Sequence, residues 1–151
     1  MALASAYGEA KRPADEIIME QCAYQQGHGP AAYELALDAG VDKRYQEAIH
    51  LYQEGVKFGS IDCARDLEVM FRHGYWYRNS NEEKTVLRSL GIGVDPEREK
   101  RYDAIYDALE INPDLKLSRL DQVLPLPPAQ LPAWSGVDDG TAPESNDRPT
   151  Y

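Results

Sequence analysis

Cysteine, histidine and basic residues are scarce in this sequence of 151 residues, and each shortage limits what the protein can be. The two cysteines, Cys22 and Cys63, could form one disulfide or none. On the repeat described below they lie in helices about two units apart, beyond the roughly 7 Å that a disulfide allows between Cα atoms. We therefore expect two free and buried thiols.

Positive charge is also in short supply, with 16 basic against 26 acidic residues and a formal net charge of -10 at pH 7. Such a surface repels a phosphate backbone, which argues against nucleic acid as a partner. The acidic surface either suits a basic protein partner or only keeps the chain soluble.

Long hydrophobic runs are missing. No apolar stretch approaches the roughly 18 residues that a membrane helix needs, and the start of the chain has neither a basic segment nor the apolar segment of a signal peptide. We expect a soluble chain without membrane insertion. Because a signal peptide could already have been removed, the N-terminus does not identify the compartment.

Motifs for catalysis or metal binding are absent as well. The sequence contains no Cys-x-x-Cys, His-x-x-x-His, G-x-S-x-G or Gly-rich phosphate loop. His50 borders the apolar stripe of a helix, and we expect it to pack against a neighbouring turn. His28 and His73 stand next to glycines and are interpreted as turn residues. The sequence therefore predicts no enzyme, no cofactor and no metal site.

What the sequence does contain is 42% hydrophobic residues, enough for one core, and an internal repeat. Each unit reads as a short helix, a turn, a longer amphipathic helix and a final glycine. One and the same interval separates the matching positions, which are Gly27 with Gly59, Ala32-x-x-Leu35 with Ala64-x-x-Leu67, Leu3-Ala4 with Leu35-Ala36, and Gly8 with Gly40.

The long helix of the middle unit carries its apolar residues on one face, at spacings of three and four. Asp42 is the predicted N-cap, and Gly59 ends the helix where a left-handed residue is needed. The stripe consists of Tyr45, Ala48, Ile49, Tyr52 and Val56.

A second copy of this helix follows with Asp95 as N-cap, Pro96 in the first turn and a stop at Asn112-Pro113. Its stripe of Tyr102, Ile105, Tyr106 and Leu109 comes later than one repeat interval would place it. The excess is an insertion that precedes the second long helix. Asn79 or Ser80 can cap a short helix within it that runs to about Leu90.

The stretch "RHGYWYR" leads from the preceding helix into the insertion, and its three adjacent aromatics between arginines cannot all point inward from one helix. Trp, Tyr and Arg are the types that anchor protein interfaces. The alternative is that the aromatics fold back to cover the insertion. The candidate partner-binding residues are Arg72, Tyr75, Trp76, Tyr77 and Arg78.

The pattern of A-x-x-L in a short helix followed by "YQEAIHLYQEGVKFG" resembles the Sel-1-like repeat of the tetratricopeptide superfamily. The matching positions are Ala32, Leu35, Gly40, Tyr45, Ala48, Ile49, Tyr52, Gly59, Ala64 and Leu67. The resemblance implies an all-α fold of αα-hairpins stacked as a short right-handed solenoid, with a concave surface for a protein partner. The expected repeat domain covers residues 1–123, with units at about 1–28, 29–60 and 61–111 and the insertion at 75–94.

Residues 124–151 are expected to form a Pro-rich cap and an acidic tail. Four prolines force an extended path on residues 124–134, which either lies along the last helix of the solenoid or binds an aromatic groove of another protein. Residues 135–151 read as a flexible acidic tail. The stretch "LPLPPAQLPAW" is similar to a segment of bacterial Sel-1-like proteins that are immunity proteins.

This second resemblance implies a protein that binds and occludes a toxic effector of type VI secretion, including phospholipase effectors of the periplasm. The implied partner is a secreted toxin, and the implied location is the periplasm if a signal peptide was removed. The alternative is a cytoplasmic helical scaffold or adaptor for a protein complex. Both readings are non-catalytic.

Overall fold

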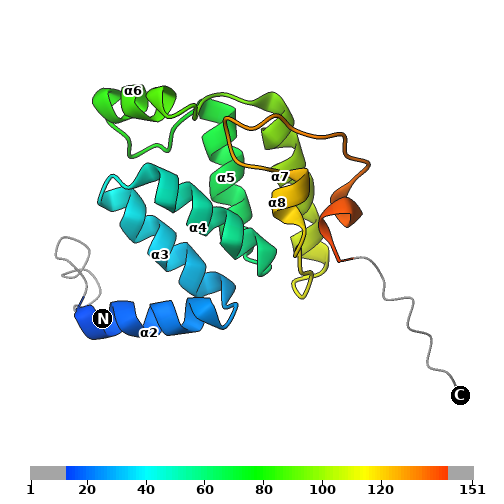
Figure 1. Cartoon of the computed structure of the whole chain (residues 1–151), viewed down its shortest axis with the longest axis horizontal. Coiled ribbons are helices and arrows are strands. Elements are labelled where there is room, and N and C mark those ends of the chain that lie inside the picture. The colour runs from blue at the N-terminus through cyan, green and yellow to red at the C-terminus, as the bar shows by residue number, and fades with distance from the viewer. Residues whose placement is uncertain (1–12, 143–151) are drawn as a thin grey trace, which may run out of the picture.

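The computed structural model describes residues 13–142, and every regular element among them is a helix (Figure 1). The elements are α2 (Ala14–Gln25), α3 (Gly29–Val41), α4 (Tyr45–Lys57), α5 (Ile61–His73), α6 (Asn81–Ser89), α7 (Pro96–Ile111), α8 (Leu120–Val123) and the 3₁₀ helix η1 (Val137–Gly140). The all-α prediction is confirmed for this part of the chain. A search of these helices for one with the length and hydropathy of a membrane span finds none.

The helices recur at the predicted interval. The starts of α3 and α5 are separated by the same interval as Gly27 and Gly59, and both helices have 13 residues. Their N-caps are His28 and Ser60, and each cap side chain accepts a hydrogen bond from the backbone N–H of the third residue after it. Gly27 and Gly59, which precede the caps, have positive φ of 80° and 91°. The matches proposed at Leu3-Ala4 and Gly8 lie outside the described residues.

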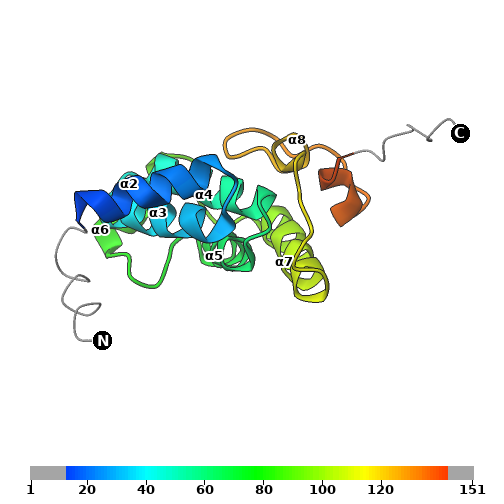
Figure 2. The ribbon, with the colours of Figure 1, turned by 90° about the horizontal axis from the view of Figure 1, so that it is seen from below.

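Consecutive helices pack against one another, α2 on α3, α3 on α4, α4 on α5 and α5 on α7. Figure 1 shows this order from the blue α2 to the yellow-green α7, with α6 beyond the end of α5. Figure 2, turned by 90°, shows α8 and the following segment on one side of the layer that contains α5 and α7. Stacking in chain order is what a repeat predicts; the right-handed solenoid stays a prediction.

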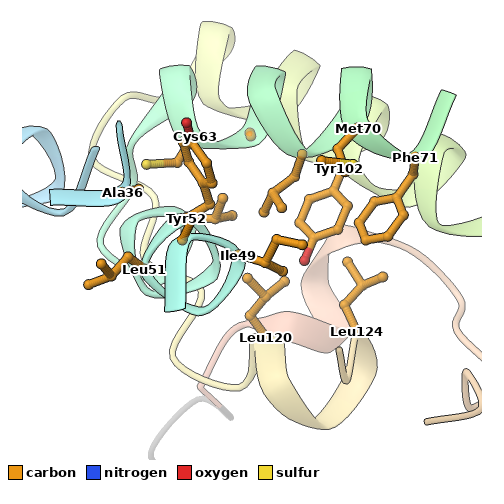
Figure 3. Close-up of a cluster of buried hydrophobic side chains, with 14 of the residues drawn as sticks. Ala36, Ile49, Leu51, Tyr52, Cys63, Met70, Phe71, Tyr102, Leu120 and Leu124 are labelled. Carbon is orange, nitrogen blue, oxygen red and sulfur yellow. The ribbon is translucent and has the colours of Figure 1, made fainter. Parts of the chain in front are cut away.

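Small residues let the central helices approach closely. A Cβ atom on Gly55 of α4 would overlap Cys63 Sγ of α5 and lie 3.2 Å from Ala32 Cβ of α3. Around this contact lies one core of aliphatic and aromatic side chains (Figure 3). Of the ten repeat positions, Leu35 and Gly59 are only partly buried. Those whose side chains are fully buried are Ala32, Ala48, Tyr52, Ala64 and Leu67.

The predictions for Asp42, His50 and Cys22 need correction. Asp42 ends α3 instead of capping α4, because Lys43 takes a left-handed φ of 61° and delays the next helix until Arg44 can act as its N-cap. His50 is exposed instead of packed on a turn, since it lies on the outer face of α4, away from the buried stripe. Cys22 is exposed, because α2 buries none of its residues; Cys63 is buried, and both thiols are free.

The second long helix and the insertion follow the prediction closely. Asp95 caps α7 with a hydrogen bond from Arg98 N, Pro96 is the first helical residue, and the helix ends before Asn112. Of its predicted stripe, only Tyr106 stays partly exposed. Ser80, not Asn79, caps the short helix of the insertion.

Two arginines of α7 hold the last residue of α8 and the segment that follows it. Arg98 donates to the carbonyls of Pro125 and Ala129, and Arg101 donates to those of Val123 and Pro132. The segment therefore lies against α7, as its orange trace beside α7 and α8 shows (Figure 1). The prediction of a flexible tail from residue 135 onward is wrong for its first residues. Residues 137–140 form η1, and Gly140 is buried and accepts a hydrogen bond from Arg119 N.

Candidate functional site

The loop of residues 74–80 joins α5 to α6 and holds four of the five predicted partner-binding residues. Gly74 ends α5 in the left-handed conformation, with φ of 79°. Asn79 then closes a turn with Trp76: its Oδ1 accepts from Trp76 N at 2.8 Å, and its own N–H donates to Trp76 O at 2.9 Å. The Asn79 amide also donates to Glu83 of α6. These bonds fix the loop between two helices.

Trp76 is the anchor of this loop and lies inside the protein. Its side chain is 5% exposed, its Nε1 donates to the carbonyl of Asp66 at 3.0 Å, and its ring centroid lies 5.4 Å from that of Tyr52. A side chain so placed offers almost no surface to a partner. The alternative reading, in which the aromatics fold back over the protein, is correct for Trp76.

The two tyrosines of the loop project differently from Trp76. Tyr77 is 78% exposed, and its hydroxyl lies 3.4 Å from Nε2 of His73. Tyr75 is partly buried, with Lys84 Nζ 3.8 Å from its ring centroid. The expectation that at least one aromatic is exposed is therefore met by Tyr77. Binding of a partner at these residues stays a prediction.

The two arginines of the predicted set also differ. Arg72 is bound on both sides within the fold, by Glu68 of its own helix and by Glu99 of α7. Arg78 has its guanidinium carbon 5.7 Å from the Trp76 ring centroid, and one of its nitrogens lies against Gly40 of α3. The structure thus brings Arg78 onto Trp76 and next to α3, whereas Arg72 is paired within α5 and with α7.

Sequence reasoning missed the residues that Arg78 adjoins. The Tyr52 hydroxyl lies near the Asp66 carboxylate and the Arg78 guanidinium, and Tyr33 of α3 lies 6.1 Å from Tyr52 between ring centroids. Burial, followed by the neighbouring Asp66 and Asp62 charges, raises the pKa of Tyr33. These groups come from α3, α4, α5 and the loop, so no local spacing could have revealed them.

The electrostatics of this cluster are dominated by burial. Burial raises the pKa of the Asp66 carboxyl, against the opposing effects of the Tyr52 hydroxyl and the Arg78 charge. Burial raises the pKa of Tyr52 as well, well above its usual value. Across residues 13–142, no set of three His, Cys, Asp or Glu side chains is arranged to hold a metal ion.

Three solved structures resemble this fold over 84% of the chain and 46% of their own length, so the chain spans about half of each. All come from Pseudomonas aeruginosa. The immunity protein PA5088 is 29% identical with a TM-score of 0.62, the immunity protein Pa5087 is 26% identical with 0.63, and PA5086 is 26% identical with 0.64.

No curated protein matches the chain. A family model does match, over residues 64–149, which include Asp66, the whole insertion and α7. This match covers more than half of the sequence. The chain therefore belongs to the family described as a domain of unknown function, DUF6396.

Proposed function

We propose that this chain is an immunity protein, which binds a toxin and blocks it without transforming any molecule. The observation that carries the proposal is the likeness to two structures described as immunity proteins, at 26% and 29% identity over 84% of this chain. Likeness at this level over most of the chain extends beyond the order of the helices. Immunity by tight binding needs a preformed surface, and we propose the hydrogen-bonded loop of residues 74–80 as part of that surface.

The proposed mechanism is occlusion of the toxin by this loop and the adjoining helices. A tyrosine that stands 78% exposed on a loop held by hydrogen bonds loses little conformational entropy when it is buried by a partner. The net charge of -10 favours fast association with a basic toxin surface. Tyr77 therefore replaces Trp76 as the proposed aromatic anchor.

The finer parts of the proposal rest on the resemblance of the Pro-rich segment to that of Sel-1-like immunity proteins. On that basis the toxin is an effector of type VI secretion, with a phospholipase as the first candidate, and the site of protection is the periplasm. The recurring helix pairs, of which α3 and α5 are the equivalent first members, are proposed to be Sel-1-like units of a short right-handed solenoid.

Growth protection tests the proposal. A candidate effector, chosen from the secreted proteins encoded near the gene for this chain, is expressed in bacteria with a periplasmic signal, together with this chain directed either to the periplasm or to the cytoplasm. We expect periplasmic chain to restore growth and cytoplasmic chain to leave the toxicity unchanged. Undiminished toxicity with both proteins present in the same compartment would refute an immunity role.

Titration of the purified toxin separates binding from catalysis. If the chain acts by occupying the toxin, residual toxin activity falls linearly and reaches zero at about one chain per toxin. Inactivation by far fewer chains than toxin molecules would instead mean that the chain is an enzyme. A stable complex with full toxin activity would contradict occlusion.

A further inference from the structure

A series of rings and cations in mutual contact leads from the end of α5 through the loop of residues 74–80 to α6. The ring centroid of His73, in the last turn of α5, lies 6.0 Å from that of Tyr75 and 5.5 Å from that of Tyr77. Lys84 Nζ of α6 lies 3.8 Å from the centroid of the Tyr75 ring. Arg88 follows Lys84 by one helical turn, on the same side of α6. These five residues are called the aromatic–basic strip.

The aromatic–basic strip is accessible from solvent. Tyr77 is 78% exposed, Arg88 is exposed, and the other three residues are partly exposed. Helix α6, which contributes both cations, lies beyond the end of α5 and packs on no other helix as extensively as the stacked helices do (Figure 1). A partner can therefore contact the strip without opening the core.

The two cations of the strip lack a counter-charge from the chain itself. Within residues 13–142, neither Lys84 nor Arg88 takes part in an ion pair. The carboxylate of Glu83 accepts a hydrogen bond from the Asn79 amide at 2.9 Å. Glu82, two residues before Lys84, lies on about the opposite side of α6. Neither carboxylate of α6 therefore neutralises these cations.

The local charge of the insertion differs in sign from that of the whole chain. Residues 75–94 contain three basic residues, Arg78, Lys84 and Arg88, against two acidic ones, whereas the chain has 16 basic and 26 acidic residues. At physiological salt, charges more than about 8 Å away are largely screened, so the nearby cations determine what binds directly to the strip. The acidic remainder and the strip thus favour opposite charges at different places on a partner.

We infer that the aromatic–basic strip binds an acidic segment of a partner protein. Carboxylates of that segment pair with Lys84 and Arg88, and an apolar or aromatic side chain between them packs on Tyr77. A tyrosine supplies a large contact area at a small cost in conformational entropy. That the partner is a toxin rests on the proposed function, whereas the preference of the strip for carboxylates does not.

Two capped tripeptides of opposite charge test the strip. Acetyl-Glu-Phe-Glu-amide and acetyl-Lys-Phe-Lys-amide are titrated separately into the full chain at about 0.15 M salt, and binding is followed by amide NMR spectra. The net charge of -10 alone would favour the lysine peptide, so a preference for the glutamate peptide isolates the local charge. The variants are Lys84→Gln, Tyr77→Ala and the control Lys100→Gln, which changes the charge equally at an exposed position of α7.

We expect the glutamate peptide to shift the amide signals of residues 73–77 and 84–88, and the lysine peptide to leave them unchanged. Lys84→Gln should weaken binding of the glutamate peptide about fivefold, the upper range for an exposed ion pair. Tyr77→Ala should weaken it about threefold, and Lys100→Gln less than about 1.5-fold. Both strip variants should stay folded, because the substituted side chains lie at the surface, and circular dichroism checks this.

The inference is overturned if the glutamate peptide shifts none of these signals, or if Lys84→Gln and Lys100→Gln weaken its binding equally. Tighter binding of a thymidine hexanucleotide than of the glutamate peptide would also overturn it, because the strip would then select phosphates over carboxylates.

The growth assay tests the same strip as a toxin contact. Lys84→Glu should lose protection while Lys100→Glu keeps it, and full protection by Lys84→Glu would contradict that contact. If the unchanged chain protects against no toxin, the proposed function fails and the peptide result stands.

Discussion

The two halves of the protein are held together in different ways. Between α3, α4 and α5 the contact is made by small apolar groups, with Gly55 pressed against Ala32 and Cys63. Between α7 and the segment after α8 the contact is made by two buried arginines that donate to backbone carbonyls. One interface is fitted by shape, and the other by directional hydrogen bonds.

The difference follows from the backbone on each side. A helix satisfies its own N–H and C=O groups, so two helices need only complementary surfaces to pack. Residues 124–136 form no helix or strand, so their carbonyl oxygens lack the regular backbone N–H donors that a helix provides. The prolines among them reduce the number of backbone N–H groups further. A guanidinium with five donors, such as that of Arg101, satisfies several such carbonyls at once. The arginines of α7 therefore supply the donors that the irregular segment of residues 124–136 needs in order to pack on the helices.

Truncating Arg101 should disrupt the contact between α7 and the segment after α8, and we expect it to lower the free energy of unfolding more than any other substitution described here. Arg101→Ala removes the donors to Val123 O and Pro132 O at a place that water hardly reaches, since the side chain is only 5% exposed. We expect a loss of about 3 kcal/mol in the free energy of unfolding, measured by urea denaturation. Lys100→Ala, exposed on the same helix, should change it by less than about 0.5 kcal/mol. Equal values for the two would show that the arginines do not hold the segment.

A larger side chain at Gly55 should disrupt the contact between α3, α4 and α5 and lower the free energy of unfolding by about 2 kcal/mol. In Gly55→Val the added atoms collide with Cys63 and Ala32, and the helices must separate. Gly93→Val is the matched control, because a Cβ there meets nothing within 4 Å. Adding Cys63→Ala to Gly55→Val should recover part of the loss. A double variant no more stable than Gly55→Val would place the collision elsewhere.

A smaller effect is expected from the bond that ties the insertion to the stack. Trp76→Phe keeps an aromatic ring beside Tyr52 but removes the Nε1 donor to the Asp66 carbonyl. The free energy of unfolding, measured by urea denaturation, should fall by about 1 kcal/mol. Unchanged stability would mean that packing alone holds the loop.

Thiol labelling perturbs the protein least, and it compares the accessibility of Cys22 in α2 with that of Cys63 in the core. Burial raises the pKa of Cys63 to about 12, so at pH 8 almost no thiolate is present there, whereas Cys22 is exposed. Iodoacetamide should therefore modify one cysteine of the native protein at pH 8 and two in denaturant, as counted by mass spectrometry. Rapid double labelling of the native protein would contradict the close packing around Gly55.

The regular part of this fold was predictable because its causes are local. Gly27 and Gly59, with the caps that follow them, fix equivalent helix starts in successive units, and the apolar spacing of α4 assigns its buried face. What could not be predicted depends on distant partners. Nothing near Arg98 in the sequence indicates that it turns inward to the carbonyls of Pro125 and Ala129.

The candidate site shows the same division. The composition of residues 72–78 predicted that at least one aromatic is exposed, but it could not tell which one, because Trp76 is held by a carbonyl of the preceding helix, at Asp66. That bond turned Trp76 inward and left Tyr77 outside. The Tyr33–Tyr52–Asp66 cluster was missed because Tyr52 was assigned only to the core. The groups near its hydroxyl come from other parts of the chain, which the sequence pattern around Tyr52 does not indicate.

Helix α2 buries none of its residues, and its side chains Ile18 and Met19 remain 56% and 69% exposed. Its amide protons should therefore exchange with deuterated solvent through local opening, at rates that do not depend on global unfolding. Those of α4 and α5 should exchange only when the whole protein opens. We therefore expect α2 to open while the other helices of residues 13–142 stay folded.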